Sequence, residues 1–376
     1  MVRIHLNDGE IPEGYSKYIG KKVTFIIATI VLLFILLIVS ISVGAVSIPP
    51  LEVAQTLIAG IIDWIYSVFN IGGCPDLSVS TQWDTIIWNI RFPQAISAII
   101  AGAGLAVAGV AMQSILRNPL GSPFTLGISH AAAFGAAFAV IVLGTGTMHS
   151  SGADAIVIDN PYITTMIAFI FAMIATGVIL VISRIRGASP EVMVLAGVAI
   201  GSLFTAGTMF LQYFADDVQL AAVVFWSFGD VARAHGNELI LMIVATVICS
   251  IYFVMNMWNY NAIDAGDETA KGLGVNVQRV RLIGMVIASF LSAIIISFLG
   301  VIGFVGLVCP HMARRIVGDD HRFLIPATIV MGGVLLLASD TAARLILAPH
   351  ILPVAILTAF LGAPVFIYLL IRGYKR

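Results

Sequence analysis

The placement of lysine and arginine along this chain constrains its fold more than any single motif does. The 376 residues are 60% hydrophobic and 10% charged, and apolar runs of about 20 residues recur throughout. A helix of about 20 apolar residues crosses the ~30 Å hydrocarbon core of a membrane. Sixteen of the 19 basic residues, all except Arg91, Arg233 and Arg344, fall in bursts between these runs. Since cytoplasmic loops are enriched in basic residues, we expect all the bursts on that side.

The spacing of the bursts predicts an even number of crossings between each burst and the next. This gives an all-α polytopic membrane protein of about ten transmembrane helices with both termini cytoplasmic. The expected spans are residues 23–43, 92–116, 127–146, 161–182, 191–213, 238–257, two short or tilted spans between 281 and 314, 323–343 and 351–371. The alternative is that short apolar segments are buried or re-entrant, which would change the count by one pair.

The domain organisation is simple. We expect residues 1–22 to be a short cytoplasmic segment and residues 23–372 to be one transmembrane domain in the cell membrane. A cleaved signal peptide is the alternative interpretation of the first span, but its apolar run is longer than is typical. The outer segment 44–84 is predicted to carry an amphipathic helix near residues 51–69.

The cysteines indicate no cofactor, and the net charge says nothing about nucleic acid, which we do not expect as a partner. Cys74, Cys249 and Cys309 are interpreted as structural, because the chain has no CxxC and no His/Cys metal-binding spacing. The net charge of −1 gives no sign of nucleic-acid binding. We expect no metal, no cofactor and no catalytic residue in this chain.

Carboxylates are nearly absent from the predicted membrane interior. Ion-coupled carriers usually keep one there, and the candidate here is Asp340. Arg344 follows four residues later, so an ion pair near a helix end is the favoured interpretation. The chain also lacks the GxxxxGK[ST] motif that binds ATP. The driving force is therefore expected from another protein. An ion-coupled secondary transporter and a membrane enzyme that uses His130 or His311 remain alternatives.

The inner loop of residues 257–281 is the most distinctive polar segment. Asp267, Glu268 and Thr269 are typical of a first helical turn, and Gly272 or Gly274 would end that short helix. A second helix would begin within 275–281. Apolar Ala270, Leu273 and Val275 are predicted to be exposed and to dock in a partner's groove. A solvated loop is the alternative.

The sequence Gly266-Asp-Glu-Thr-Ala-Lys-Gly-Leu-Gly-Val275 resembles the cytoplasmic coupling loop of the FecCD-type permeases. These are membrane subunits of ABC importers for ferric siderophores, haem and vitamin B12. Further similar stretches follow in the same order over about residues 23–372: Ser47–Val53, Arg91-Phe-Pro93, Arg117–Leu120, Leu126–Ser129, Gly303–Arg314, Asp320–Arg322 and Leu361–Pro364.

The resemblance implies ten helices, a permease homodimer, two cytosolic ATPase subunits and an extracytoplasmic substrate-binding protein. ATP hydrolysis would occur on the partner subunits. The residues implied to contact the ATPase are Gly266, Asp267, Glu268, Thr269, Ala270, Leu273, Gly274 and Val275.

The resemblance also implies that basic residues opening the second helix and ending the ninth dock the binding protein. Here these are Arg91 and Arg344, and arginine suits planar pairing with carboxylates. A second basic residue commonly follows the first by three positions, but this chain has Gln94, so that contact is expected to be weaker or rearranged. Snorkelling of both arginines to the interface is the alternative.

The translocation path of the family runs along the fifth and tenth helices. By resemblance, the fifth helix offers Thr205, Thr208, Met209 and Gln212, with ordinary hydrogen bonding between helices as the alternative. His311 and His321 are predicted to pack at helix ends, and no role is assigned to His130. A ferric complex is the favoured substrate, but no residue distinguishes ferric siderophores, haem, cobalamin or oxyanions.

Overall fold

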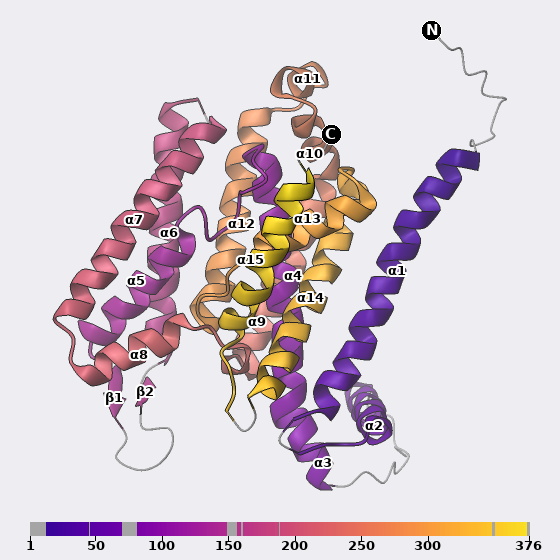
Figure 1. Ribbon diagram of the computed structural model, residues 1–376, viewed down its shortest axis with the longest axis vertical. Coiled ribbons are helices and arrows are strands. Elements are labelled where there is room, and N and C mark those ends of the chain that lie inside the picture. The colour runs from indigo at the N-terminus through magenta and orange to yellow at the C-terminus, as the bar shows by residue number, and fades with distance from the viewer. Residues whose placement is uncertain are drawn as a thin grey trace.

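The computed structural model describes residues 13–44, 46–69, 81–148, 156–158, 161–187, 189–347 and 350–373. Within these residues, seven helices are long and apolar enough to cross a membrane. They are α1 (Glu13–Ser42), α4 (Phe92–Ile115), α6 (Pro161–Ile185), α7 (Pro190–Tyr213), α9 (Gly236–Met255), α12 (Val277–Leu299) and α14 (His321–Ile346). The predicted polytopic helical membrane protein is confirmed at this level (Figure 1).

Shorter elements complete the bundle. Apolar α5 (Ile128–Ile141) and α8 (Asp217–Ser227) are below spanning length, and α15 (Val354–Gly373) is the last helix described. One antiparallel hairpin, β1 (Gly146–Met148) with β2 (Ile156–Ile158), departs from the all-α expectation. Sequence reasoning missed α8, although Asp216 and Gln219 form a capping box at its start.

Two predicted spans differ from their expected lengths. Of the two short or tilted spans expected between residues 281 and 314, α12 is not short: it begins earlier, at Val277, and has 23 residues. Only α13 (Val305–Val317) is short, because Gly300 and Phe304 take positive φ angles of 81° and 67° and shape the turn before it. The span expected at 127–146 is also too long, because α5 has 14 residues and ends at Ile141. At 1.5 Å per residue these two helices measure about 20 Å.

Both short helices begin inside the bundle. A Cβ placed on Gly109, in α4, would lie 1.8 Å from the carbonyl oxygen of Gly306, so the first turn of α13 contacts the interior of α4. A Cβ on Gly127, just before α5, would lie 2.7 Å from the carbonyl oxygen of Gly197 in α7. Glycine therefore permits the backbone contacts that place two helix N-termini within the bundle.

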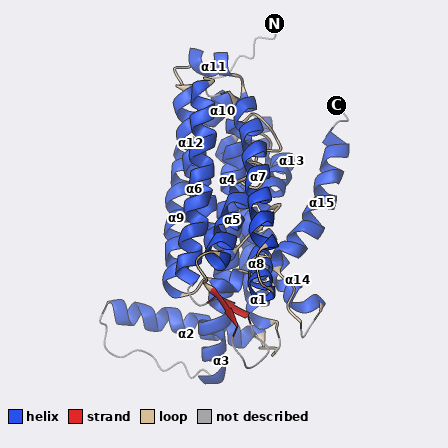
Figure 2. Ribbon diagram, turned by 90° about the vertical axis from the view of Figure 1, so that its left-hand side faces the viewer, coloured by secondary structure: helices blue, strands red, loops and turns tan. Residues whose placement is uncertain are grey.

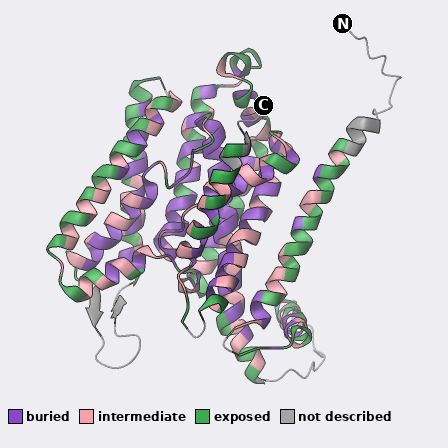
Figure 3. Ribbon diagram, in the orientation of Figure 1, coloured by how far each residue is buried: buried purple, intermediate pink, exposed green. Residues whose placement is uncertain are grey.

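Helix α4 forms the centre of the core. Every residue from Ala101 to Ile115 is buried, whereas α1, α6 and α7 carry many exposed apolar residues (Figure 3). Gly102 lies against α14, where an added Cβ would be 2.2 Å from the carbonyl oxygen of Gly332. Small residues thus let helices approach closely in a membrane, where the hydrophobic effect adds little between them.

The two ends of the bundle differ. Helices α10 (Met257–Asp264) and α11 (Asp267–Gly272) lie at one end, where α1 also begins and α15 ends (Figure 1). At the opposite end, α2 (Pro50–Val68) lies roughly perpendicular to the long helices and projects to one side of the bundle, and α3 (Thr81–Ile86) leads through the π-helix η1 (Ile87–Arg91) into α4 (Figure 2). The short 3-10 helix η2 (Val231–Arg233) precedes α9.

The predicted amphipathic helix near residues 51–69 is confirmed as α2. Leu51 and Phe69 are 70% and 69% exposed, while Val53 is fully buried. Cys249 and Cys309 are buried free thiols, in agreement with a packing role. Cys74 lies outside the described residues.

The contact between α4 and α14 gives a stability prediction. Gly102→Ala introduces a Cβ 2.2 Å from the carbonyl oxygen of Gly332, so the helices must separate, and we expect a loss of about 1–3 kcal/mol in the free energy of unfolding. Gly177→Ala in α6 is the matched control, because no atom lies within 4 Å of its Cβ position. Thermal unfolding in detergent should show a much lower midpoint for Gly102→Ala alone. Equal midpoints for the two variants would contradict the close packing.

Candidate coupling site

The coupling loop, residues 257–281, forms the predicted short helix–turn–helix. Asp267 and Glu268 occupy the first turn of α11, where carboxylates favour the positive end of the helix dipole. After Gly272 the chain turns through Gly274, at φ 81°, and its N–H bonds the carbonyl of Lys271 at 2.9 Å. The N–H of Val275 bonds the carbonyl of Ala270 at the same distance. This Schellman motif ends α11 and returns the chain to α12.

The loop has a small hydrophobic core of its own. Ala262, Ile263, Ala270 and Val277 are buried together, and Val275 packs against them. The prediction that Ala270 is exposed is therefore wrong, because α11 folds back and Ala270 closes this core at 0% exposure. Val275 is half-buried, while Leu273 is 69% exposed. Leu273 is thus the apolar residue of the predicted three that a partner can reach.

Arg281 joins the coupling loop to the core of the bundle. Its Nη1 and Nη2 each donate to an oxygen of Asp267 at 2.7 Å, and its Nε donates to the carbonyl oxygen of Ile115 at 3.1 Å. The Arg281 side chain is only 5% exposed. A bidentate pair fixes orientation as well as distance. The first turn of α11 is therefore fastened to the end of α4.

Arg117 adds a second cation beside Asp267. Its Nη1 lies 3.6 Å from Oδ1 of Asp267, and its backbone has a φ of 45°, uncommon for a residue other than glycine. The hydrogen bonds from Arg281 hold the pKa of Asp267 below its usual range. The ion pair is thus complete at neutral pH and weakens only in acid.

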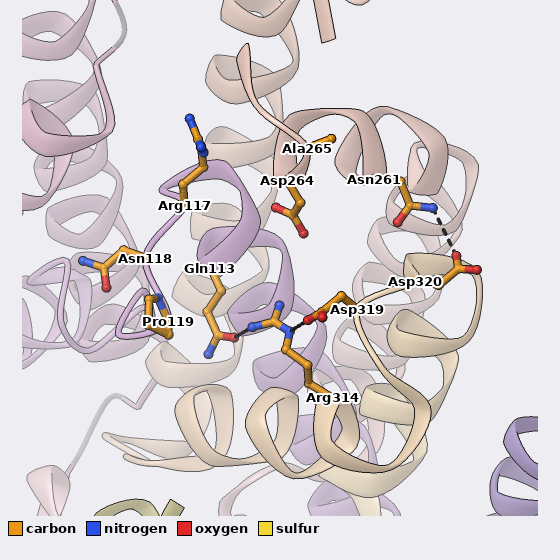
Figure 4. Close-up of a pocket in the computed structure, with 10 residues that line it drawn as sticks. All are labelled: Gln113, Arg117, Asn118, Pro119, Asn261, Asp264, Ala265, Arg314, Asp319 and Asp320. Carbon is orange, nitrogen blue, oxygen red and sulfur yellow. Dashed lines mark hydrogen bonds and ion pairs between the residues drawn. The ribbon is translucent and has the colours of Figure 1, made fainter. Parts of the chain in front are cut away.

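A polar cavity of about 620 Å³ lies beneath α10 (Figure 4). Its lining residues come from the ends of α4, α10 and α13 and from the loops that follow α4 and α13: Gln113, Arg117, Asn118, Pro119, Asn261, Asp264, Ala265, Arg314, Asp319 and Asp320. Arg314 pairs with Asp319 at 3.0 Å, and Asn261 donates to Asp320 at 3.1 Å. Most of the charged side chains that line the cavity are paired with opposite charges. The cavity therefore resembles a structural contact between helix ends more than a ligand site.

Asp264 is a carboxylate of this cavity whose pKa is raised by its surroundings. Its Oδ2 lies 3.4 Å from both Oγ of Ser114 and Nε2 of His321. Burial raises the pKa of Asp264 to about 6, against the opposing attraction of Arg314. Ser114 Oγ lies 2.6 Å from the same Nε2, and Nδ1 of His321 has no partner among the described residues. A hydrolytic triad would place the carboxylate on Nδ1, so the cluster is a packing contact.

Of the two histidines predicted to pack at helix ends, His321 is found at one: it opens α14 and contacts Ser114. The prediction is wrong for His311, which lies in the middle of α13, where its Nε2 bonds the carbonyl of Pro119 at 2.9 Å. No group of three or more His, Cys, Asp or Glu side chains arranged for a metal occurs in the described part of the chain.

Arg91 and Arg344 lie at the opposite end of the bundle and cap α1. Arg91 donates to the carbonyls of Ile41, at 2.6 Å, and of Ser42 and Val46, and is 7% exposed. Arg344 donates to the hydroxyl of Ser40 at 2.7 Å. Both guanidiniums therefore face inward in this structure, and neither presents a free fork for a docking protein.

Asp340 is paired, as the i,i+4 spacing predicted. Its Oδ2 lies 3.1 Å from Nε of Arg344, and its Oδ1 accepts from Nε2 of Gln94 at 3.0 Å. Gln94 thus has a local partner within the bundle. A carboxylate held by two neighbours is poorly suited to carry a coupling ion.

The four predicted passage residues lie along α7, and two of them, Thr205 and Met209, line the cavity described below. The hydroxyls of Thr205 and Thr208 donate to carbonyls four residues earlier in α7, not to a neighbouring helix. Thr205 and Met209 line a cavity of about 480 Å³ between α5 and α7. Thr208 and Gln212 lie outside its lining.

Sequence reasoning missed the contacts of Arg281. It was counted only as a basic residue of the loop, and a contact to a carbonyl 166 positions earlier leaves no local pattern. The burial of Asp264 also could not be predicted from the local sequence, because it depends on α13 and α14.

Comparison with known proteins agrees with this geometry. Residues 32–372 match the FecCD transport family. A protein of Methanocaldococcus jannaschii, named as an ABC transporter permease, is 50% identical over 98% of this chain and 99% of its own length. The hemin transport system permease protein HmuU of Yersinia pestis is 35% identical over 81% of this chain and 91% of its own.

A solved structure is similar in fold. It is an inward-facing conformation of a transporter described as a metal-chelate type ABC transporter. The TM-score is 0.76 at 26% identity, and the match covers 93% of this chain and 99% of that chain.

The buried Asp264 gives a pH prediction. Because its pKa is raised, the native state holds a proton that the unfolded chain releases between about pH 4 and 6, so stability falls as the pH rises through that window. Asp264→Asn removes this contribution. We expect the decrease in thermal midpoint from pH 4.5 to 7 to be smaller in the variant, by roughly 2–4 °C. Glu268→Gln, at a side chain 89% exposed, is the control. An unchanged slope in Asp264→Asn would contradict the assignment.

Proposed function

The chain belongs to the FecCD transport family, and from this premise we propose how it works as the permease subunit of an ABC importer. Two copies would form the membrane channel, with two cytosolic ATPase subunits and an extracytoplasmic binding protein. In this family, ATP is hydrolysed on the separate subunits. The chain itself is the multi-pass membrane component, and its substrate is proposed to be an iron-chelate-type compound.

The proposed topology has ten crossings with both termini in the cytoplasm. Seven long helices and α15 supply eight, and short α5 and α13 supply the other two. The start of α1 and the end of α15 lie at the same end as α11, which supports an even count (Figure 1). Arg117, Arg281 and Arg314, from three of the basic bursts, lie beside α10 and α11 at that end, so it is assigned to the cytoplasm.

The observation that carries the proposal is an exposed docking residue fastened to the core. Leu273 projects from α11, and Asp267 in the first turn of α11 is held by Arg281, which also bonds α4. A partner that grips Leu273 can therefore displace α11 and α4 together. A solvated loop would need neither the small hydrophobic core around Ala270 nor the bidentate pair between buried Arg281 and Asp267.

Movement of α4 would reach most of the permease. Its glycines contact α13 and α14 through backbone, so these helices cannot slide independently. ATP-driven closure of the partner subunits would switch the bundle between outward and inward access. Shifting such an equilibrium from 1:99 to 99:1 takes about 5.5 kcal/mol.

Docking of the binding protein at the opposite end remains a proposal. Arg91 and Arg344 hold the end of α1 against the bundle, and Gln94 joins α4 to α14 through Asp340. Direct pairing with acidic residues of a partner requires the arginines to give up these contacts. We propose that they act mainly by fixing the surface on which the binding protein rests.

An ion-coupled secondary transporter is not favoured by any contact in the described residues. Asp340, the carboxylate this alternative requires, is occupied by Gln94 and Arg344. The comparison proteins support a metal-chelate or haem type of substrate.

The proposal is tested at Leu273. Leu273→Asp places a charge on the exposed apolar contact, so we expect the ATPase subunits to co-purify at least tenfold less and ATP-dependent uptake in proteoliposomes to fall with them. Lys271→Asp is the control, because its side chain is also exposed but polar. Normal assembly of Leu273→Asp, or uphill uptake by the permease without an ATPase, would contradict the proposed function.

A further inference from the structure

The cavity between α5 and α7 contains one ionisable side chain. Its lining is otherwise small, apolar or hydroxyl-bearing: Phe124, Thr125, Gly127, Gly197, Val198, Gly201, Ser202, Thr205, Ala206 and Met209. The exception is His130, in the first turn of α5. Ionisable residues at membrane depth are costly and usually face a substrate path or a partner.

The imidazole of His130 lacks a protein partner on its buried side. Its Nδ1 is enclosed and has no hydrogen bond among the described residues. That nitrogen lies 3.6 Å from the position a Cβ would take on Gly201, and the ring stacks on Phe124 at 4.9 Å between centroids. The Cε1–Nε2 edge is therefore the part of the ring that can reach the cavity.

The hydroxyl groups around the cavity do not offer free protons. Ser202 donates to the carbonyl of Val198 and Thr205 to that of Gly201, both at 2.9 Å. The Thr125 hydroxyl donates to the carbonyl of Leu120 or Ser122. Among the side chains that line the cavity, His130 thus supplies the one available N–H donor, and no carboxylate is present to attract a free cation.

We infer that His130 is a substrate contact of the translocation path and donates its ring N–H to an anionic oxygen of the transported metal chelate. This rests on the proposed function and extends it from α7 to α5. Thr205 and Met209, predicted from resemblance, border the same cavity. A volume of about 480 Å³ is within the usual range for small-ligand sites.

The ligand class follows from the donor set. Oxygen-rich ferric chelates carry carboxylate, hydroxamate or catecholate oxygens, which accept a hydrogen bond. A lipid chain would gain nothing from a donor and would leave the imidazole desolvated. Free metal cations would meet no ligand oxygen with a negative charge here. One directional bond in an apolar cavity also suits a transit site, because the cargo must leave again.

The test uses the assembled transporter in proteoliposomes, with radiolabelled ferric citrate as the probe. His130→Leu removes the donor, whereas His130→Gln keeps an N–H donor in a side chain of comparable length. We expect uptake to fall about tenfold in His130→Leu and to stay within about threefold of the unmodified protein in His130→Gln. ATPase co-purification and thermal midpoints should be unchanged in both.

Failure of the inference differs from failure of the proposed function. If the unmodified complex shows no ATP-dependent uptake of any metal chelate, the function itself is wrong. If it carries cobalamin but no ferric citrate, the assigned ligand class is wrong. If it carries ferric citrate and His130→Leu transports normally, or both variants fall equally, the donor role of His130 is wrong.

A labelling experiment covers the case in which His130→Leu misfolds. Ser202→Cys places a thiol in the cavity lining, and Val181→Cys places one on the 61% exposed outer face of α6. With Cys74 replaced by serine, a charged, membrane-impermeant thiol reagent should modify the first thiol, be slowed by ferric citrate, and leave the second unmodified. Equal protection of both thiols from the reagent would place the cavity against lipid and overturn the inference.

Discussion

The bidentate contact between Asp267 and Arg281 is the interaction on which the mechanical account depends. Both arms measure 2.7 Å, the Arg281 side chain is enclosed, and Nε of Arg281 also donates to the carbonyl of Ile115. A buried arginine of this kind contributes orientation more than net stability, because desolvation offsets much of the attraction. Its value here is that the first turn of α11 cannot tilt without displacing the end of α4.

Helix α4 can distribute such a displacement because its neighbours touch it through backbone. Because positions 102, 109, 306 and 332 are glycines, no side chain separates α4 from α13 and α14 there, and the helices touch through backbone atoms. Packed interiors of this density respond by switching between arrangements, not by gradual deformation. The short helices α5 and α13 begin within this core, so their N-termini would move with it. The cavity of His130 lies at one of these starts.

Much of this organisation could be predicted from the sequence, because a membrane simplifies the problem. Long apolar runs and clustered arginines indicated the spans, and α4 was placed within one residue of its observed end. The helix–turn–helix of the coupling loop followed from acidic residues and glycines at fixed offsets. Local rules failed where a contact joins distant segments. Ala270 was expected outside because its burial depends on Ile263 and Val277. Docking of the binding protein by Arg91 and Arg344 was expected from resemblance, and the sequence does not show that both donate to groups at the end of α1.

In this mechanism, the movement that ATP hydrolysis imposes on α11 reaches α4 through Arg281. The number of substrate molecules imported per ATP hydrolysed tests this most directly. Arg281→Lys keeps the charge but cannot bridge Asp267 and Ile115 together. The ATPase should still assemble, since Leu273 is untouched, while import per ATP falls about tenfold. Arg279→Lys, at an exposed neighbouring position, should leave the ratio unchanged. If Arg281→Lys imports substrate with the unmodified ratio, the link between α11 and α4 does not transmit the power stroke.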